Sequence, residues 1–155
     1  MNETLIHNIN SVAKKDDTIW FLGDFGFFKE TQDYDVIRSR IICENINIIW
    51  GNHDHKNKIR HCFKEAHEQV LIKINGQRIV LNHYPMLSWE NDNKGAWMLH
   101  GHCHGNMNDW INNNEDMKNA KIVDLGVDCW NFKLLSFNDI KEYMDKKPGK
   151  LLRGR

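Results

Sequence analysis

The chain has 155 residues, about the length of one domain, and its 41% hydrophobic and 27% charged residues are the balance of a folded globular protein. Basic and acidic side chains number 21 each, which argues against binding of long nucleic acid, because such proteins usually carry a basic excess. No apolar run approaches the roughly 20 residues that cross a membrane. Four widely spaced cysteines without a secretory leader predict a reduced, cytoplasmic protein.

Helical and strand-like patterns alternate along the chain, which is typical of an α/β fold. Residues 1–145 are interpreted as one domain, and the basic residues 146–155 as a flexible tail or a phosphate-attracting arm. Asn75-Gly76 is a strong hairpin signal, and Ser136 with Asp139 predicts a helix-capping box. In chain order the expected elements are a helix over 3–14, a strand over 18–22, a helix over 36–41, a strand over 46–50, a helix over 56–66, strands over 70–74, 78–81 and 96–99, a polar loop with a turn of helix over 106–119, strands over 122–125 and 134–135, and a helix over 138–145.

Potential metal ligands follow four of the expected strands. The motifs are Phe21-Leu22-Gly23-Asp24, Gly51-Asn52-His53-Asp54, Asn82-His83 and Gly101-His102-Cys103-His104. Sites of open α/β folds gather where such loops converge, at the carboxyl ends of the strands. Mixed oxygen and imidazole ligands are typical of hydrolytic centres that hold Mn²⁺, Fe, Zn²⁺ or Ni²⁺, whereas structural zinc sites more often use closely paired cysteines.

These motifs, in this order, resemble those of the calcineurin-like metallophosphoesterases, and of the small bacterial and bacteriophage branch in particular. The resemblance covers residues 3–140, and it implies an α/β sandwich of two mixed β-sheets flanked by helices. The flanking sequences that strengthen it are Leu22-Gly23-Asp24-Phe25-Gly26-Phe27, Asn82-His83-Tyr84-Pro85-Met86 and Asp124-Leu125-Gly126-Val127-Asp128-Cys129-Trp130.

The resemblance also implies a role for each motif residue. Asp24 would bridge two divalent metal ions, with Mn²⁺ foremost among the candidates. His104 would bind one ion, and the shell of the other would be completed by Asn52, His83 and His102. His53 would lie near the substrate, where it stabilises the phosphate or protonates the leaving oxygen. Asp54 would either orient His53 or cap the following helix.

This chemistry predicts a hydrolase of phosphomonoester or phosphodiester bonds. Two cations about 3.5–4 Å apart lower the pKa of water, so that metal-activated hydroxide attacks phosphorus in line. The expected substrate is a small phosphorylated compound or a nucleotide. The alternatives are a non-catalytic or weakly active metal-binding module for partner contacts, and a nuclease of longer nucleic acid.

One family motif is missing from the sequence. The family has Asp-x-His on a strand before its first helix, whereas Met1 here already falls inside the expected first helix. The second metal site is therefore expected to be weakened, and activity to be impaired. Three explanations stay open: a truncated reading frame, a short form completed by another chain, or a degenerate member that binds one metal. An unfilled strand position also predicts homo-oligomers through the free sheet edge.

The loop after His83 contains two aromatic residues with two interpretations each. Trp89 and Tyr84 either pack in the protein or line the cleft and stack on a base. Cys103, inside the histidine motif, is interpreted as a small filler residue, with a ligand role as the alternative.

Overall fold

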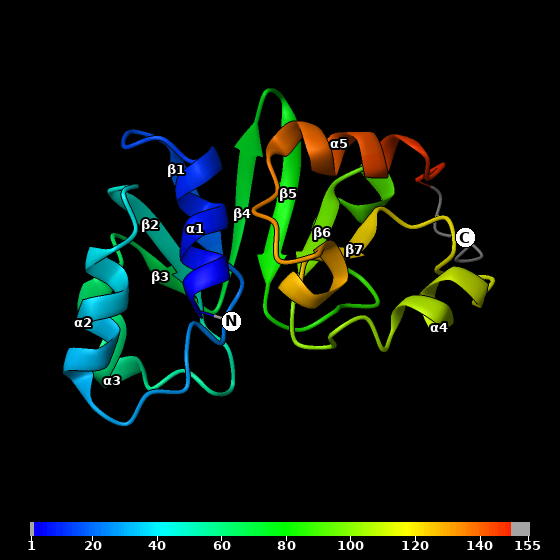
Figure 1. The fold of residues 1–155 in the computed structure, drawn as a ribbon. Helices are drawn as coiled ribbons and strands as arrows, with labels where there is room; N and C mark the ends of the chain where they lie inside the picture. Colours follow the sequence, from blue (N-terminus) through cyan, green and yellow to red (C-terminus); the bar gives the residue numbers. More distant parts are fainter. Residues whose placement is uncertain (1, 150–155) are drawn as a thin grey trace.

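Two sheets form the framework of the computed structural model, which describes residues 2–149 (Figure 1). Sheet A has the order β1-β2-β3, and its strands are all parallel. Sheet B has the order β4-β5-β6-β7, with β4 antiparallel to β5 and the other pairs parallel. The strands are β1 (Thr18–Phe21), β2 (Asn45–Ile49), β3 (Ala66–His67), β4 (Gln69–Ile74), β5 (Gln77–Asn82), β6 (Trp97–His100) and β7 (Ile122–Asp124).

Helices flank both sheets. Figure 1 shows α2 and α3 beside sheet A, α1 in front of it, and α4 and α5 beside sheet B. The α-helices are α1 (Asn2–Val12), α2 (Thr31–Ser39), α3 (Lys56–Ile59), α4 (Asn108–Asn113) and α5 (Phe137–Asp145). Short 3-10 helices are η1 (Arg60–Cys62), η2 (Asp92–Lys94) and η3 (Val127–Trp130).

Alternation along the strands divides the core into layers, because successive side chains of a strand point to opposite faces. In β2, Ile48 packs in a cluster with Ile9 of α1 and Tyr34 of α2, whereas Ile49 belongs to the cluster that contains Leu81 of β5. That second cluster joins the two sheets and includes Ile140 and Met144 of α5. A third cluster covers the other face of sheet B and contains Val80, Met98 and Ile122.

The expected fold class is confirmed: two sheets flanked by helices, with sheet B mixed and the described strands of sheet A parallel. Positive φ angles of 49° at Asn75 and 85° at Gly76 are those of the expected hairpin turn. The capping box of Ser136 and Asp139 is present at the start of α5.

Three local expectations differ from the structure. The helix expected over 56–66 ends at Cys62, because the chain then extends to pair β3 with β2. The helix expected over 36–41 begins earlier, at Thr31, and ends at Ser39. Residues 134–135 are not a strand and pair with none of the described strands. Leu134 packs in the first cluster, with Ile48, and Leu135 packs in the second cluster, between the sheets, so the segment links two parts of the core.

The first residues of the expected tail are attached to the domain. Lys147 Nζ donates to the Ile122 carbonyl oxygen over 2.9 Å, and Gly149 N–H donates to that of Asn119 over 2.8 Å. Residues 150–155 lie outside the described residues. Among residues 2–149, no helix combines the length and the apolar character that crossing a bilayer requires.

The edge of sheet A generates a first prediction. Within residues 2–149, β1 pairs with β2 alone, and an edge strand offers a row of N–H and C=O groups to another strand. We expect the chain to self-associate at micromolar concentration, with a mass in light scattering that is a multiple of 18.4 kDa. A strictly monomeric mass across a hundredfold dilution series would contradict this expectation.

Candidate metal centre

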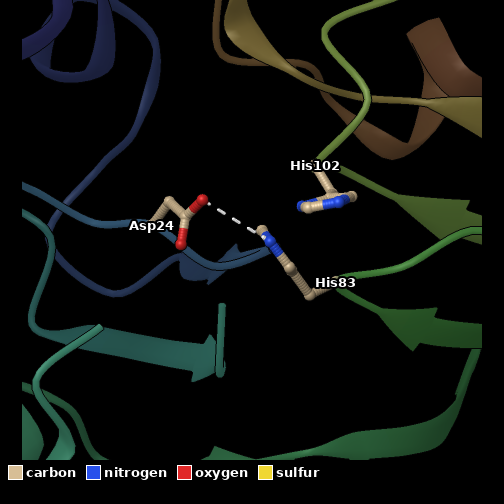
Figure 2. A group of neighbouring side chains, drawn as sticks. All are labelled: Asp24, His83 and His102. Carbon is tan, nitrogen blue, oxygen red and sulfur yellow. Dashed lines mark ion pairs between the residues drawn. The ribbon is translucent and has the colours of Figure 1, made fainter. Parts of the chain in front are cut away.

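The loops that follow β1, β2, β5 and β6 meet at one place. Asp24 and Asn52 follow strands of sheet A, and His83 and His102 follow strands of sheet B. Figure 2 shows the side chains of Asp24, His83 and His102 pointing toward one another across this junction. One ligand atom from each of these three residues lies within 4.8 Å of the other two.

His83 lies at the centre of this group. Its side chain is buried, and Nδ1 lies 2.6 Å from the Leu22 carbonyl oxygen. A neutral imidazole has one N–H, so we assign the hydrogen to Nδ1, which leaves the Nε2 lone pair directed at the junction. Nε2 lies 3.0 Å from Asn52 Oδ1 and 3.5 Å from Asp24 Oδ2.

Three lone-pair atoms thus converge without a hydrogen between them. Such an arrangement is repulsive unless a cation occupies the junction, and neutral imidazole, amide oxygen and carboxylate are all ligands of divalent first-row metals. His102 adds a second imidazole, with its ring centroid 5.0 Å from that of His83. Asp24, Asn52, His83 and His102 therefore fit a divalent ion, and they are the four residues that the sequence motifs assign to one shell.

Two glycines allow this convergence. A Cβ on Gly51 would lie 2.2 Å from Asp24 Oδ1, and a Cβ on Gly23 would lie 2.3 Å from His83 Nδ1. Gly23 also has a φ of 95°, which L side chains rarely adopt. Any larger residue at either position would displace a candidate ligand.

The backbone of three candidate ligands is strained. Asp24, His102 and His104 have φ angles of 55°, 66° and 49°, in the left-handed region that costs a non-glycine residue about 1–2 kcal/mol. Such strain gathers at functional sites when the surroundings hold it in place. Hydrogen bonds hold it here: Asp24 N–H donates to Asp54, and Gly105 N–H, after His104, donates to Asp124.

Asp54 joins the loops of β1 and β2. Its Oδ2 accepts the N–H groups of Gly51 over 2.8 Å and of Asp24 over 2.9 Å, and its Oδ1 accepts that of Phe25 over 2.9 Å. Burial raises the pKa of Asp54 above its ordinary value, the three N–H donors lower it, and the Asp24 carboxylate raises it. The sequence suggested that Asp54 orients His53 or caps the next helix; the contacts that the structure gives it are these backbone contacts.

His53 lies at the exposed side of the same loop. Its backbone N–H donates to Asp24 Oδ1 over 2.9 Å, and its ring centroid lies 5.1 Å from that of the exposed Phe27. Asn52 and His53 line one cavity together with Phe27. This position beside the candidate ligands suits a group that acts on the substrate, and the catalytic role of His53 stays a prediction.

His104 lies outside the group of three. Its Nδ1 lies 2.5 Å from Asp128 Oδ2, and two thirds of its side chain is exposed. A carboxylate on Nδ1 orients an imidazole so that Nε2 is available to a metal. Its assignment to a second ion stays a prediction.

Asp124 and Asp128 are supporting residues to which the sequence analysis gave no role, although both lie in a flanking sequence that strengthens the resemblance. Asp124 is buried at the end of β7 and accepts the N–H groups of Gly105 and Gly126, while Asp128 contacts His104. The available signal was an acid at the end of a buried strand, as at Asp24. For Cys103, burial and then the Asp124 carboxylate raise the thiol pKa, and Cys103 is not in the group of three candidate ligands among the described residues.

A second group has ligand-type atoms within 4.8 Å of one another: Asp35, His61 and Cys62. His61 Nε2 lies 2.5 Å from Asp35 Oδ1, and both of these side chains are about half exposed. No strand-end motif of the sequence contributes to this group. It provides a control for metal-binding experiments.

We predict that Asp24→Gly removes metal binding at the junction. Glycine accepts the left-handed backbone of residue 24 and removes the side chain, including the Oδ1 that accepts the His53 N–H. Calorimetric titration of the metal-free chain with Mn²⁺ should show a binding event that the variant lacks and that His61→Ala retains. Loss of the event in His61→Ala, but not in Asp24→Gly, would place the ion at the other group.

We predict that Asp54→Asn loosens the centre. The amide would turn an NH₂ group toward backbone N–H donors, and each unsatisfied buried group costs about 1–3 kcal/mol. Urea unfolding should show a loss of this size, and Mn²⁺ affinity should fall, whereas Asp16→Asn, which changes an exposed carboxylate, should do neither. Unchanged stability in Asp54→Asn would refute the role given to its hydrogen bonds.

Comparisons with known proteins agree with this architecture. The uncharacterized protein MJ1445 of Methanocaldococcus jannaschii is 32% identical over 160 residues, which cover 99% of this chain and 79% of that protein. The crystal structure of the protein of unknown function AQ665 from Aquifex aeolicus shares the fold, with a TM-score of 0.71, 22% identity, and coverage of 92% of this chain and 84% of that one. The calcineurin-like phosphoesterase superfamily domain matches residues 2–126. The chain therefore belongs to the calcineurin-like phosphoesterase superfamily.

Proposed function

We propose that this protein is a metal-dependent hydrolase of phosphomonoester or phosphodiester bonds. The observation that carries the proposal is the convergence of the His83, Asn52 and Asp24 acceptor atoms beside the exposed His53. Membership of a phosphoesterase superfamily supports a phosphoester as the bond that is cleaved.

A divalent ion at this centre would neutralise charge on the phosphoryl oxygens and would lower the pKa of water, so that hydroxide is available to attack phosphorus near neutral pH. The chain supplies the rest. Asp24, Asn52, His83 and His102 would hold the ion, and Asp54 keeps two of their loops in register. His53 delivers a proton to the leaving oxygen, or stabilises the phosphate as a cation.

The finer properties are proposals as well. The centre is proposed to bind one or two divalent ions, with Mn²⁺ as the first candidate, because its ligands are carboxylate, amide and imidazole groups and include no thiolate. The proposed location is the cytoplasm, because the four cysteines are all free and thiols stay reduced in that compartment. A small phosphorylated compound or a nucleotide is the proposed substrate.

A non-catalytic metal-binding module is the second candidate, favoured by the exposed position of His104 outside the group of three. Hydrolysis of bis(p-nitrophenyl) phosphate and p-nitrophenyl phosphate with added Mn²⁺ separates the two candidates. A hydrolase turns over at least one substrate and loses that turnover in Asp24→Gly. Absence of turnover in a folded, metal-loaded chain would favour the module.

His53 has a specific signature in this assay. A general acid matters little for p-nitrophenolate, which leaves without a proton, and contributes about 10²–10⁴-fold when the leaving oxygen is basic. We expect His53→Gln to lower kcat/KM for methyl p-nitrophenyl phosphate modestly and for alkyl phosphodiesters far more, with His67→Gln as a control. Equal losses for both leaving groups would exclude general-acid catalysis by His53.

A further inference from the structure

A cavity of about 470 Å³ adjoins the metal centre. Asn52, a candidate ligand, forms part of its wall, and His53 lies next along the chain, so the cavity and the centre share a border. Sites for small organic ligands typically have about 300–1,000 Å³. The cavity is therefore large enough for a group attached to a phosphate at the centre.

Phe27 gives one wall an aromatic surface. It is 73% exposed, the largest value among the exposed apolar side chains of the described residues. Water contact on an aromatic face is unfavourable, and a planar ligand that stacks on the ring removes that contact. The His53 ring, 5.1 Å away and tilted by 56°, stands beside it.

The loop that carries Phe27 is fixed from below. The Tyr34 hydroxyl is fully buried, accepts the Phe28 N–H over 3.2 Å, and lies 3.1 Å from the carbonyl oxygens of Gly26 and Phe28. Phe28 packs edge-on against the Tyr34 ring. Phe27 is thus presented to solvent by a held backbone, so binding a planar group costs little ordering of the loop.

Basic side chains provide the other wall. Lys29, His55 and Lys58 line the cavity, and its described lining contains no carboxylate. Lys58 Nζ donates to the Lys29 carbonyl oxygen over 2.6 Å, which positions the ammonium while its remaining N–H groups can bind an anion. This local excess of cations stands out in a chain with no net charge.

The order of these groups gives the ligand a direction. A phosphorus atom held at the centre would, on the proposed function, have its leaving oxygen on the side of His53, and the His53 ring, the Phe27 ring 5.1 Å from it and the two lysines line the same cavity. On the proposed function, water adds its hydroxyl to phosphorus, the bond from phosphorus to the leaving oxygen breaks, and that oxygen takes up a proton. What departs toward the cavity is the leaving group.

We propose that this cavity binds a nucleotide as the leaving group, with the base stacked on Phe27 and its phosphate beside Lys29 and Lys58. The inference rests on the proposed function for the direction of departure. It assigns the substrate class as small diesters or anhydrides in which a nucleotide is released. The overall neutrality of the chain favours free nucleotides over long nucleic acid.

Equilibrium binding tests the cavity without turnover. Adenosine 5′-monophosphate, the model product, and ribose 5-phosphate, which lacks the base, would be titrated by calorimetry into the full chain with and without Mn²⁺. Because a stacked base is worth about 1–3 kcal/mol, the nucleotide should bind at least about fivefold tighter. Equal affinity of the two compounds would overturn the proposal.

Variants assign the preference to its residues. Phe27→Ala should abolish the difference between the two compounds, Phe27→Trp should retain it, and Leu87→Ala, at another exposed apolar residue, should leave it unchanged. Lys58→Met should weaken both compounds several-fold. A preference that survives Phe27→Ala would place the base elsewhere and overturn the assignment.

Two further outcomes separate this inference from the proposed function. Base-dependent binding by a chain that hydrolyses no phosphoester would support the cavity as a nucleotide site while the proposed hydrolase, and with it the leaving-group direction, fails. Turnover of p-nitrophenyl esters without base-dependent binding would overturn the inference and leave the hydrolase standing. A fluorescent oligothymidylate that binds far tighter than the mononucleotide would replace free nucleotides with single-stranded nucleic acid as the ligand.

Discussion

The carboxylate of Asp54 is the contact on which the centre depends. It brings the end of β1 to the end of β2 by accepting three backbone N–H groups, from Asp24, Phe25 and Gly51. Hydrogen bonds to an ionised acceptor are stronger than neutral ones, and they offset part of the cost of burying the charge, although burial still leaves the pKa of Asp54 raised. The same contact holds Asp24 in its left-handed conformation, directs its carboxylate to the junction, and places Asn52 opposite His83.

A second link sets the distance between the sheets. The core between them packs Trp20, Leu22 and Ile49 of the sheet A side against Leu81 and Leu99 of sheet B. At the end of this core, the imidazole of His83 reaches from sheet B to the Leu22 carbonyl oxygen of the β1 loop. One ring therefore orients a metal-binding nitrogen and connects the two sheets at the same time.

Sequence reasoning found the residues whose signal is local. A buried strand followed by glycine and a polar ligand could be recognised at Asp24, Asn52 and His102, and the order of the motifs gave the family. It did not find Asp54 as the connector, because its partners are backbone groups that become neighbours only when two distant strands pair.

The aromatic residues show the same limit. Trp89 is buried, and its Nε1 donates to the Ala96 carbonyl oxygen, so it packs rather than stacks on a ligand. Tyr84 is half exposed beside His102, with ring centroids 4.6 Å apart, and thus lines the centre. In the sequence, Phe27 was noted only as part of a flanking motif of the family. Its exposure could not be predicted, because it depends on how the Tyr34 hydroxyl holds the loop. The pair Leu134-Leu135 was predicted to be a strand because both residues are apolar. Two apolar residues do not reveal whether a neighbouring strand is available for pairing, and none of the described strands pairs with them.

The positive φ angles at Asp24, His102 and His104 restrict how these positions can change during evolution. Asparagine, aspartate, histidine and glycine are the residues that tolerate this backbone best. Three of the four carry a metal-binding atom. Glycine keeps the backbone and removes the ligand, whereas each of the other three replacements exchanges one ligand type for another. Substitutions other than glycine that keep these loops folded would therefore change the choice of metal rather than delete a ligand.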